Sequence, residues 1–350
     1  MHKSTKVITL ITFILFSVAS VSSIVFTAET KPIVFKLGHF EPPDVYTTIE
    51  HPMAVVFKSI VEARTNGQIK VEIYPSCTLG KEREMMESTQ LGVIQGCIIA
   101  EGTVPIFFPL IQVFSIPYLF PTESIGWKVT DGSFGKELFE EMRRTTGLRV
   151  IATGRGAFRN FTNSKHPIHS PKDMKGLKLR TMQIPAHMAM VKALGGAATP
   201  ISWAEIYSAL QTGVVDGQEN PVGIIVSGRL YEVQKYLTLD GHVYSTSFFM
   251  INDEWFKSLP KSYQKIILDA GRAATVTGRG VSRLQDALGL KKLKDEGMEV
   301  YSPTSEEMAE FRKRSQGTVI QWLRENVKGS DKWIDKLLKE TEDTEKKLGW

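Results

Sequence analysis

Short apolar segments alternate with longer amphipathic ones along most of this chain. Between Ile69 and Ile73 every second residue is apolar, which is the period of a strand with one buried face. Between Pro52 and Arg64 the apolar residues recur every three or four positions, as along one side of a helix. The same patterns predict strands at 33–37, 97–100, 148–153 and 244–251, and helices at 81–91, 124–144, 202–213, 253–296 and 305–349. This alternation predicts an α/β fold with helices packed on mostly parallel sheets.

Three features interrupt or refine the pattern. Gly154-Arg155-Gly156 directly follows a predicted strand and indicates a crossing between two α/β units, which would leave a cleft between them. The stretch 103–121 is rich in proline and aromatic residues, so we expect an irregular wall there. Ser202 and Glu205 have the spacing of a capping box and predict a helix start.

The first 28 residues have the pattern of a secretory signal. A basic start, MHKSTK, is followed by an apolar run over 7–26 that serine and threonine dilute. Cleavage after Ser23 and cleavage after Ala28 both remain open, and so does an uncleaved anchor, because about 20 apolar-leaning residues can span a bilayer. Cys77 is the first cysteine and lies too far along for a lipoprotein anchor. We therefore expect a periplasmic protein.

The composition suits a globular protein of about two domains, with 350 residues, 42% hydrophobic and 23% charged. Removal of residues 1–28 takes away Lys3 and Lys6 and lowers the formal charge from +5 to +3. No stripe of lysine and arginine with interleaved aromatics is present, so nucleic-acid binding is not expected. The run KKLK at 291–294 is followed by acidic residues and fits a solvated helix face.

Cys77 and Cys97 are the two cysteines of the chain. An exported protein meets an oxidising compartment, where the two could pair. A disulfide between them would close a loop of about 20 residues and stabilise the fold by roughly 3 kcal/mol. Two buried free thiols are the alternative, since the sequence does not supply the distance that decides the question.

One arginine stands at the end of a predicted strand. Lys178 and Arg180 alternate with Leu177 and Leu179, so the Arg180 guanidinium emerges beside a crevice at the strand's carboxyl end. A guanidinium binds a carboxylate through two parallel hydrogen bonds, most strongly where water is scarce. An anion-binding site and a structural salt bridge are both open at this point.

The segments around Arg180 have a distinctive wording: GLKLR at 176–180, ATPISWAEIYSALQTG at 198–213 and VVDGQENP at 214–221. Their order and spacing closely resemble the DctP-type substrate-binding proteins of TRAP transporters. The resemblance covers nearly the whole chain after residue 30, including VFKLGHF, YPSCTLGKEREMMESTQLG, IPYLF and NSKHPI. It implies a two-lobed type II periplasmic-binding-protein fold with a ligand cleft between the lobes and a long helix spanning both. Lobe I would comprise 33–155 plus 246–285, and lobe II 156–245 plus 286–350.

The resemblance also implies a ligand and partners. The protein would capture a small organic acid by its carboxylate and deliver it to the small and large membrane subunits of a TRAP transporter. Arg180 would form the bidentate bridge, Arg159 would be a second arginine aimed at the pocket, and Asn220 would supply an amide. Two guanidinium groups and an amide could fill the roughly four acceptor positions of one carboxylate.

Five further residues are candidates for ligand contact, and the same resemblance is the ground for Trp203 and Glu101. Trp203 would form an aromatic wall or pack in the core, and Gln183 would touch the ligand or face solvent. Glu101 would accept from a ligand hydroxyl or amine, or cap a turn. Tyr244 would bind a polar ligand end or have structural partners. Phe40 stands where sialic-acid-binding relatives place an asparagine, so a large sugar acid loses one expected partner. We expect a modest organic acid: a dicarboxylate, a branched hydroxy or keto acid, or an aromatic acid.

An enzyme is not expected. The chain has no GxSxG, P-loop, HExxH or CxxC motif, so neither a metal nor a cofactor is indicated. Asp216 and Glu219 are acidic neighbours, yet they lie where the resembled family has a structural turn. A ligand sensor coupled to a membrane receptor or kinase is the alternative, because its fold and site would be identical. A monomer is expected.

Overall fold

The computed structural model describes residues 31–350, and residues 32–350 form one compact unit. The expected signal at 1–28 lies outside the described residues. Among the helices of residues 31–350, none has the length and apolar character needed to cross a bilayer.

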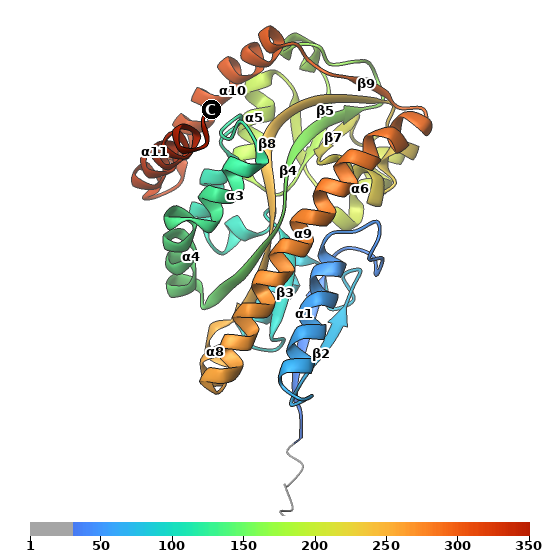
Figure 1. Ribbon diagram of the computed structural model, residues 1–350. Coiled ribbons are helices and arrows are strands. Elements are labelled where there is room, and N and C mark those ends of the chain that lie inside the picture. Colours follow the sequence, from blue (N-terminus) through green and yellow to red (C-terminus); the bar gives the residue numbers. More distant parts are fainter. Residues whose placement is uncertain (1–30) are drawn as a thin grey trace, which may run out of the picture. The chain divides into compact units, whose positions relative to one another are not determined.

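One mixed sheet organises the unit, in the order β2-β1-β3-β8-β4-β7-β5-β6, with β9 paired to β8 (Figure 1). The strands of the described chain are β1 (Ile33–His39), β2 (Ile69–Tyr74), β3 (Gly96–Ala100), β4 (Leu148–Asn163), β5 (Lys178–Thr181), β6 (Ala197–Pro200), β7 (Gly217–Asn220), β8 (Tyr236–Asn252) and β9 (Glu299–Tyr301). Strands β1 to β3 pair in parallel at one end of the sheet, and β5 to β7 at the other. The long antiparallel strands β4 and β8 join the two ends, which gives the unit its two lobes.

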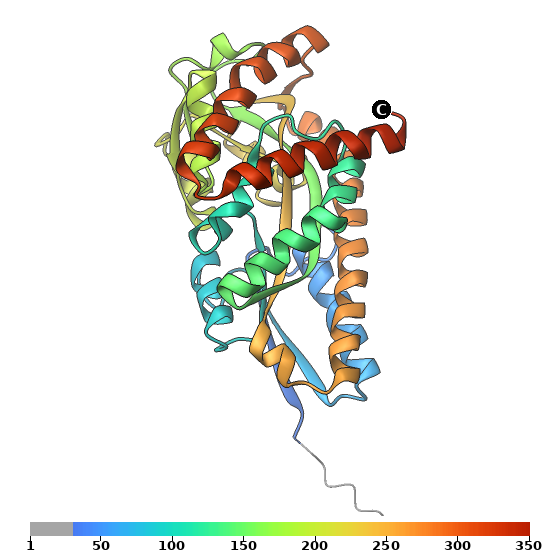
Figure 2. The ribbon, with the colours of Figure 1, turned by 90° about the vertical axis from the view of Figure 1, so that its left-hand side faces the viewer.

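Helices cover both faces of this sheet (Figures 1 and 2). They are α1 (Glu50–Arg64), α2 (Glu82–Gln90), α3 (Glu123–Asp131), α4 (Ser133–Thr146), α5 (Pro185–Leu194), α6 (Ile206–Gln211), α7 (Val222–Ser227), α8 (Asp253–Ser258), α9 (Lys261–Asp295), α10 (Ser305–Asn326) and α11 (Ser330–Leu348). Short 3-10 helices are η1 (Val104–Ile106), η2 (Pro109–Ser115), η3 (Pro171–Met174), η4 (Trp203–Glu205) and η5 (Leu230–Glu232). The long helix α9 packs along α1, crosses β4 and reaches α7.

The apolar face of α1 and alternate residues of β1 build one core. Phe35 and Leu37 of β1 are fully buried, as are Met53 and Phe57 of α1. Phe57 lies edge-on to Phe249 of β8, with ring centroids 4.7 Å apart. The helical spacing of α1 and the strand alternation of β1 thus each direct apolar side chains into this core.

The sequence pattern predicted a strand that ends at residue 153, but the strand does not end at Gly154-Arg155-Gly156. Strand β4 continues to Asn163, with a register shift between Arg155 and Ala157. Arg155 has φ 55° and Gly156 has φ 75°. A Cβ on Gly156 would lie 2.0 Å from Nε1 of Trp127, so only glycine fits there. This bulge redirects the strand and turns Arg155 into the interior, where it is 1% exposed.

Four predicted helices also differ from the sequence pattern. The segment 253–296 divides into α8 and α9, and 305–349 divides into α10 and α11. The segment 124–144 divides into α3 and α4 at Gly132, which is the N-cap of α4. Ser202 and Glu205 form no capping box; the Ser202 hydroxyl donates to the Glu205 carboxylate instead, and the 3-10 turn η4 precedes α6. The irregular wall expected at 103–121 consists of η1, η2 and the loops around them.

Candidate functional site

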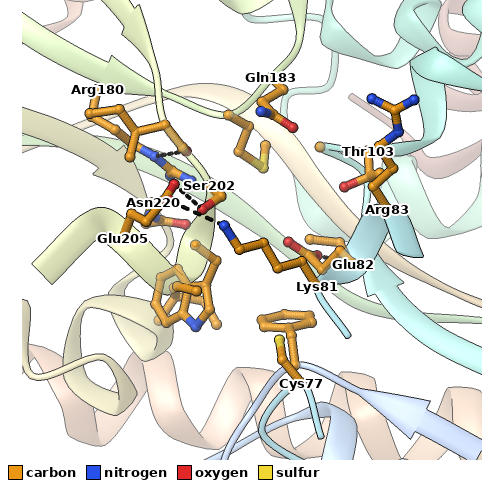
Figure 3. Close-up of a pocket in the computed structure, with 18 of the residues that line it drawn as sticks. Cys77, Lys81, Glu82, Arg83, Thr103, Arg180, Gln183, Ser202, Glu205 and Asn220 are labelled. Carbon is orange, nitrogen blue, oxygen red and sulfur yellow. Dashed lines mark hydrogen bonds and ion pairs between the residues drawn. The ribbon is translucent and has the colours of Figure 1, made fainter. Parts of the chain in front are cut away.

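A cavity of about 180 Å³ lies between the two ends of the sheet (Figure 3). Arg180 of β5 and Asn220 of β7 line it from one end. Phe40, directly after β1, and Glu82, at the start of α2, line it from the other. The cavity is smaller than the roughly 300–1,000 Å³ of pockets for drug-sized ligands, so it suits a compact solute.

Arg180 is the charged centre of one wall. The alternation along β5 buries Leu179 in the core and turns Arg180, 3% exposed, toward the cavity. Its Nε donates to the carbonyl oxygen of Ile201 at 2.8 Å, which fixes the plane of the guanidinium. Within residues 31–350 no carboxylate forms an ion pair with Arg180. Burial lowers the pKa of Arg180 to about 10, although attraction by the Glu219 and Glu82 carboxylates opposes the shift, so the side chain is still charged at neutral pH.

Asn220 lies beside Arg180 at the carboxyl end of β7. Its Oδ1 accepts from Nη2 of Arg159 at 3.1 Å, and its Nδ2 donates to Oε1 of Gln218. Because an amide carries two N–H donors, one remains for a ligand. The hydrogen bonds to Arg159 and Gln218 fix the orientation of the Asn220 amide.

Arg159 is not a lining residue of this cavity. It is fully buried and pairs with Glu219, with Nη2 donating to Oε1 at 3.0 Å and Nε to Oε2. Glu219 also lies 3.2 Å from Nε2 of His242, whose Nδ1 is 2.8 Å from Asp240. Burial opposes the charge on His242, but Asp240 and Glu219 outweigh it and raise the His242 pKa to about 9. The structure thus places Arg159 in a buried ionic network behind Asn220.

Aromatic and polar side chains complete the cavity. Phe40 and Trp203 meet edge to face with ring centroids 6.1 Å apart. Gln183 lies across the open space from Arg180 in Figure 3. Lys81 and Glu205, both more than half exposed, form an ion pair at 3.1 Å that joins the two sides of the cavity.

Glu101 and Tyr244 line a separate, smaller cavity. Glu101 accepts from the hydroxyl of Ser245 at 2.7 Å and from Arg159 at 3.4 Å. Tyr244 packs against Phe120, with ring centroids 5.2 Å apart. Of the eight candidates for ligand contact, the structure therefore gathers five around one cavity: Arg180, Asn220, Trp203, Gln183 and Phe40.

Arg180 is the one charged lining residue that the sequence suggested as a ligand contact; those not suggested are Lys81, Glu82, Arg83, Glu84, Arg155 and Glu205. Arg155 pairs with Glu50 at 2.7 Å and lies over the ring of Phe40, 5.7 Å from its centroid. The unusual Gly-Arg-Gly wording was its one signal. Glu82 belongs to KEREMM, where a polar helix start looks like a solvated face, and nothing in the sequence sets it apart.

The two cysteines are free thiols in the structure. Burial raises the pKa of Cys77 to about 11 and that of Cys97 to about 12. No group of three or more His, Cys, Asp or Glu side chains able to hold a metal ion occurs within residues 31–350.

The fold, with its cavity between two sheet ends joined by long strands, is that of the two-lobed periplasmic binding proteins. The family model described as bacterial extracellular solute-binding protein, family 7 (DctP), matches residues 38–325. The chain belongs to this family, whose members are solute-binding proteins rather than enzymes.

Three similar proteins illustrate the range of the family. A solute-binding protein of Verminephrobacter eiseniae is 39% identical over 70% of this chain and 72% of its own length. The C4-dicarboxylate-binding periplasmic protein DctP of Rhodobacter capsulatus is 32% identical over 81% of this chain and 84% of its own. A TRAP periplasmic solute-binding protein of Polaromonas sp. JS666, solved with bound D-erythronate, is 33% identical, with a TM-score of 0.81 over 87% of this chain and 98% of the other.

Proposed function

We propose that this protein captures a small organic acid in the periplasm and delivers it to the membrane subunits of a TRAP transporter. The observation that carries the proposal is Arg180: a buried guanidinium, held in place by Ile201, that faces the cavity and forms no ion pair within residues 31–350. A buried charge of this kind is unfavourable until an anion neutralises it. A carboxylate fits best, because its two oxygens match the guanidinium fork.

Each residue has a distinct part in this proposal. Arg180 supplies the charge and the orientation of the carboxylate, and Asn220 donates its remaining amide hydrogen. Arg159 acts as a positioning residue, because it holds Asn220 at 3.1 Å while its own charge is met by Glu219. Phe40 and Trp203 exclude water and strengthen the ion pair.

The two lobes would close over the ligand. In this proposal the lobes are 33–155 plus 246–285 and 156–245 plus 286–350, and β4 and β8 bend between them. The register shift of β4 between Arg155 and Ala157 supports a hinge at this point, because a bulge is a local bend in a strand. The Lys81–Glu205 ion pair, which already joins the two sides of the cavity, would hold the closed form and give the transporter subunits a closed surface to dock on.

A thermal-shift panel on the mature protein tests the proposal, using mono- and dicarboxylates with their neutral amides as matched controls. Binding to the native state raises the melting temperature. A free ligand concentration of one hundred times Kd stabilises the native state by about 2.7 kcal/mol. We expect shifts with acids and none with their amides, and mass spectrometry should recover the acid unchanged. Shifts confined to neutral or cationic compounds, or chemical turnover of the acid, would contradict the proposal.

A further inference from the structure

Glu82 faces Arg180 across the cavity, at the start of α2 (Figure 3). Its Oε1 accepts from the backbone N–H of Ala100 at 3.2 Å, which holds the carboxyl group in the wall. Within residues 31–350 it forms no ion pair, because the neighbouring Lys81 reaches Glu205 instead. An acidic group therefore lies opposite the arginine that would bind a ligand's carboxylate.

Three other cations line the cavity. Lys81 and Arg83 are exposed, where solvent screens their charge, and Lys81 is paired with Glu205. The other buried cation, Arg155, is already neutralised. Its guanidinium pairs with Glu50 at 2.7 Å, and both side chains are fully buried. Arg180 is thus the cavity's one unpaired buried guanidinium among the described residues. A dicarboxylate would place one carboxylate at Arg180 and the other in a space of about 180 Å³ that it shares with Glu82.

The polar groups near Glu82 suit hydroxyl groups better than a second anion. A carboxylate only accepts hydrogen bonds, so Glu82 needs a donor from the ligand. Thr103 and Gln183 also line this side of the cavity and can both donate and accept. Hydroxyl groups on a short carbon chain satisfy all three, because each hydroxyl donates once and accepts as well.

We infer that Glu82 selects hydroxy carboxylic acids over unsubstituted dicarboxylates, by accepting hydrogen bonds from hydroxyls at the end of the ligand remote from Arg180. This inference rests on the proposed function, since it takes the carboxylate at Arg180 as given. It names the class of acid, which the sequence left open between dicarboxylates, hydroxy acids and others.

The ionisation of Glu82 agrees with this role. Burial raises the Glu82 pKa to about 7, while Arg180 of β5 and Arg155 of β4 oppose that rise and Glu50 of α1 adds to it. Above pH 7 the group is therefore largely an anion that repels a second carboxylate. Protonation of Glu82 would remove that repulsion.

The test is calorimetric titration at pH 8 with acids matched in carbon number: D-erythronate against succinate, and gluconate against adipate. For the pair that binds more tightly, wild type should prefer the hydroxy acid at least tenfold. Glu82→Gln should abolish or reverse this preference, because the amide no longer repels a carboxylate. Glu87→Gln, on an exposed position of the same helix, should change neither affinity.

The outcomes separate the two levels of the argument. Wild-type protein that binds the dicarboxylate as tightly as the hydroxy acid overturns the role of Glu82, and so does an unchanged preference in Glu82→Gln. In either case loss of both acids in Arg180→Lys leaves the proposed function standing. If wild type binds none of the four acids and no other carboxylate, the proposed function fails and the inference fails with it.

Discussion

Replacing Arg180 by methionine should separate ligand binding from folding stability. The variant keeps much of the side-chain volume and removes the charge. Truncating one partner of a buried, hydrogen-bonded charge pair costs about 2–5 kcal/mol of affinity. Since about 1.4 kcal/mol is a factor of ten, we expect Kd to rise roughly 30-fold to several thousand-fold. Arg180→Lys should also bind poorly, because an ammonium cannot form the two parallel hydrogen bonds.

The empty protein should respond differently. Burial lowers the Arg180 pKa from 12.5 to about 10, and each pKa unit is worth about 1.36 kcal/mol. Holding the charged guanidinium in the unliganded cavity therefore costs on the order of 3 kcal/mol, and this cost is fully present at pH 7 because the group is charged in both states. Arg180→Met removes it, so the free energy of unfolding should stay the same or rise.

Urea unfolding and calorimetric titration measure the two effects on the same samples. The titration uses the acid that most stabilises wild type in a thermal-shift panel. Arg272→Met, in an exposed ion pair with Asp269, is the matched control and should change neither quantity appreciably. Unchanged affinity in Arg180→Met would show that the anchor lies elsewhere. Loss of more than about 2 kcal/mol of stability would show that Arg180 is a structural cation.

Three further predictions concern the surroundings of the site. Arg159→Met should destabilise the fold by about 3–5 kcal/mol in urea unfolding, because it leaves Glu219 buried without its arginine partner. The control Arg144→Met, in an exposed ion pair with Glu141, should cost less than about 1 kcal/mol. Equal losses of stability in the two variants would refute the buried network. The affinity of wild type for succinate should rise as pH falls from 8 to 6, because Glu82 becomes neutral near pH 7. In Glu82→Gln the affinity should depend much less on pH. A succinate affinity of wild type that does not change with pH would contradict the role of Glu82. Thiol titration without reductant should find two slow thiols in the folded protein and two fast ones after unfolding, because burial raises both cysteine pKa values; no thiols after unfolding would mean a disulfide.

Most elements followed from hydrophobic periodicity, because burial is what creates the pattern. The α1 and β1 residues that recur at helical and strand spacing are those that pack in the core, such as Phe35 and Phe57. The pattern placed the end of the strand at residue 153, whereas β4 continues through the glycines at 154 and 156 to Asn163. Here they permit a bulge inside a 16-residue strand, because Trp127 leaves no room for a Cβ.

Two kinds of information in the sequence predicted residues of the candidate site: their position at the ends of strands and the resemblance to a known family. Arg180 and Asn220 end neighbouring strands, so their side chains meet at one edge of the sheet. The pairing of Arg159 with Glu219 depends on the register of β4 against β7, which no local pattern encodes. Glu82 reaches the cavity because the two ends of the sheet face each other, and this long-range arrangement leaves no mark near residue 82.

A crystal structure of the mature protein with its tightest-binding acid tests the central claim most directly. We predict that the ligand lies in the cavity between the lobes, with its carboxylate on the two Nη atoms of Arg180 and a donated hydrogen bond from Asn220. A ligand bound in another cavity, or one bound here with its carboxylate turned away from Arg180, would contradict it.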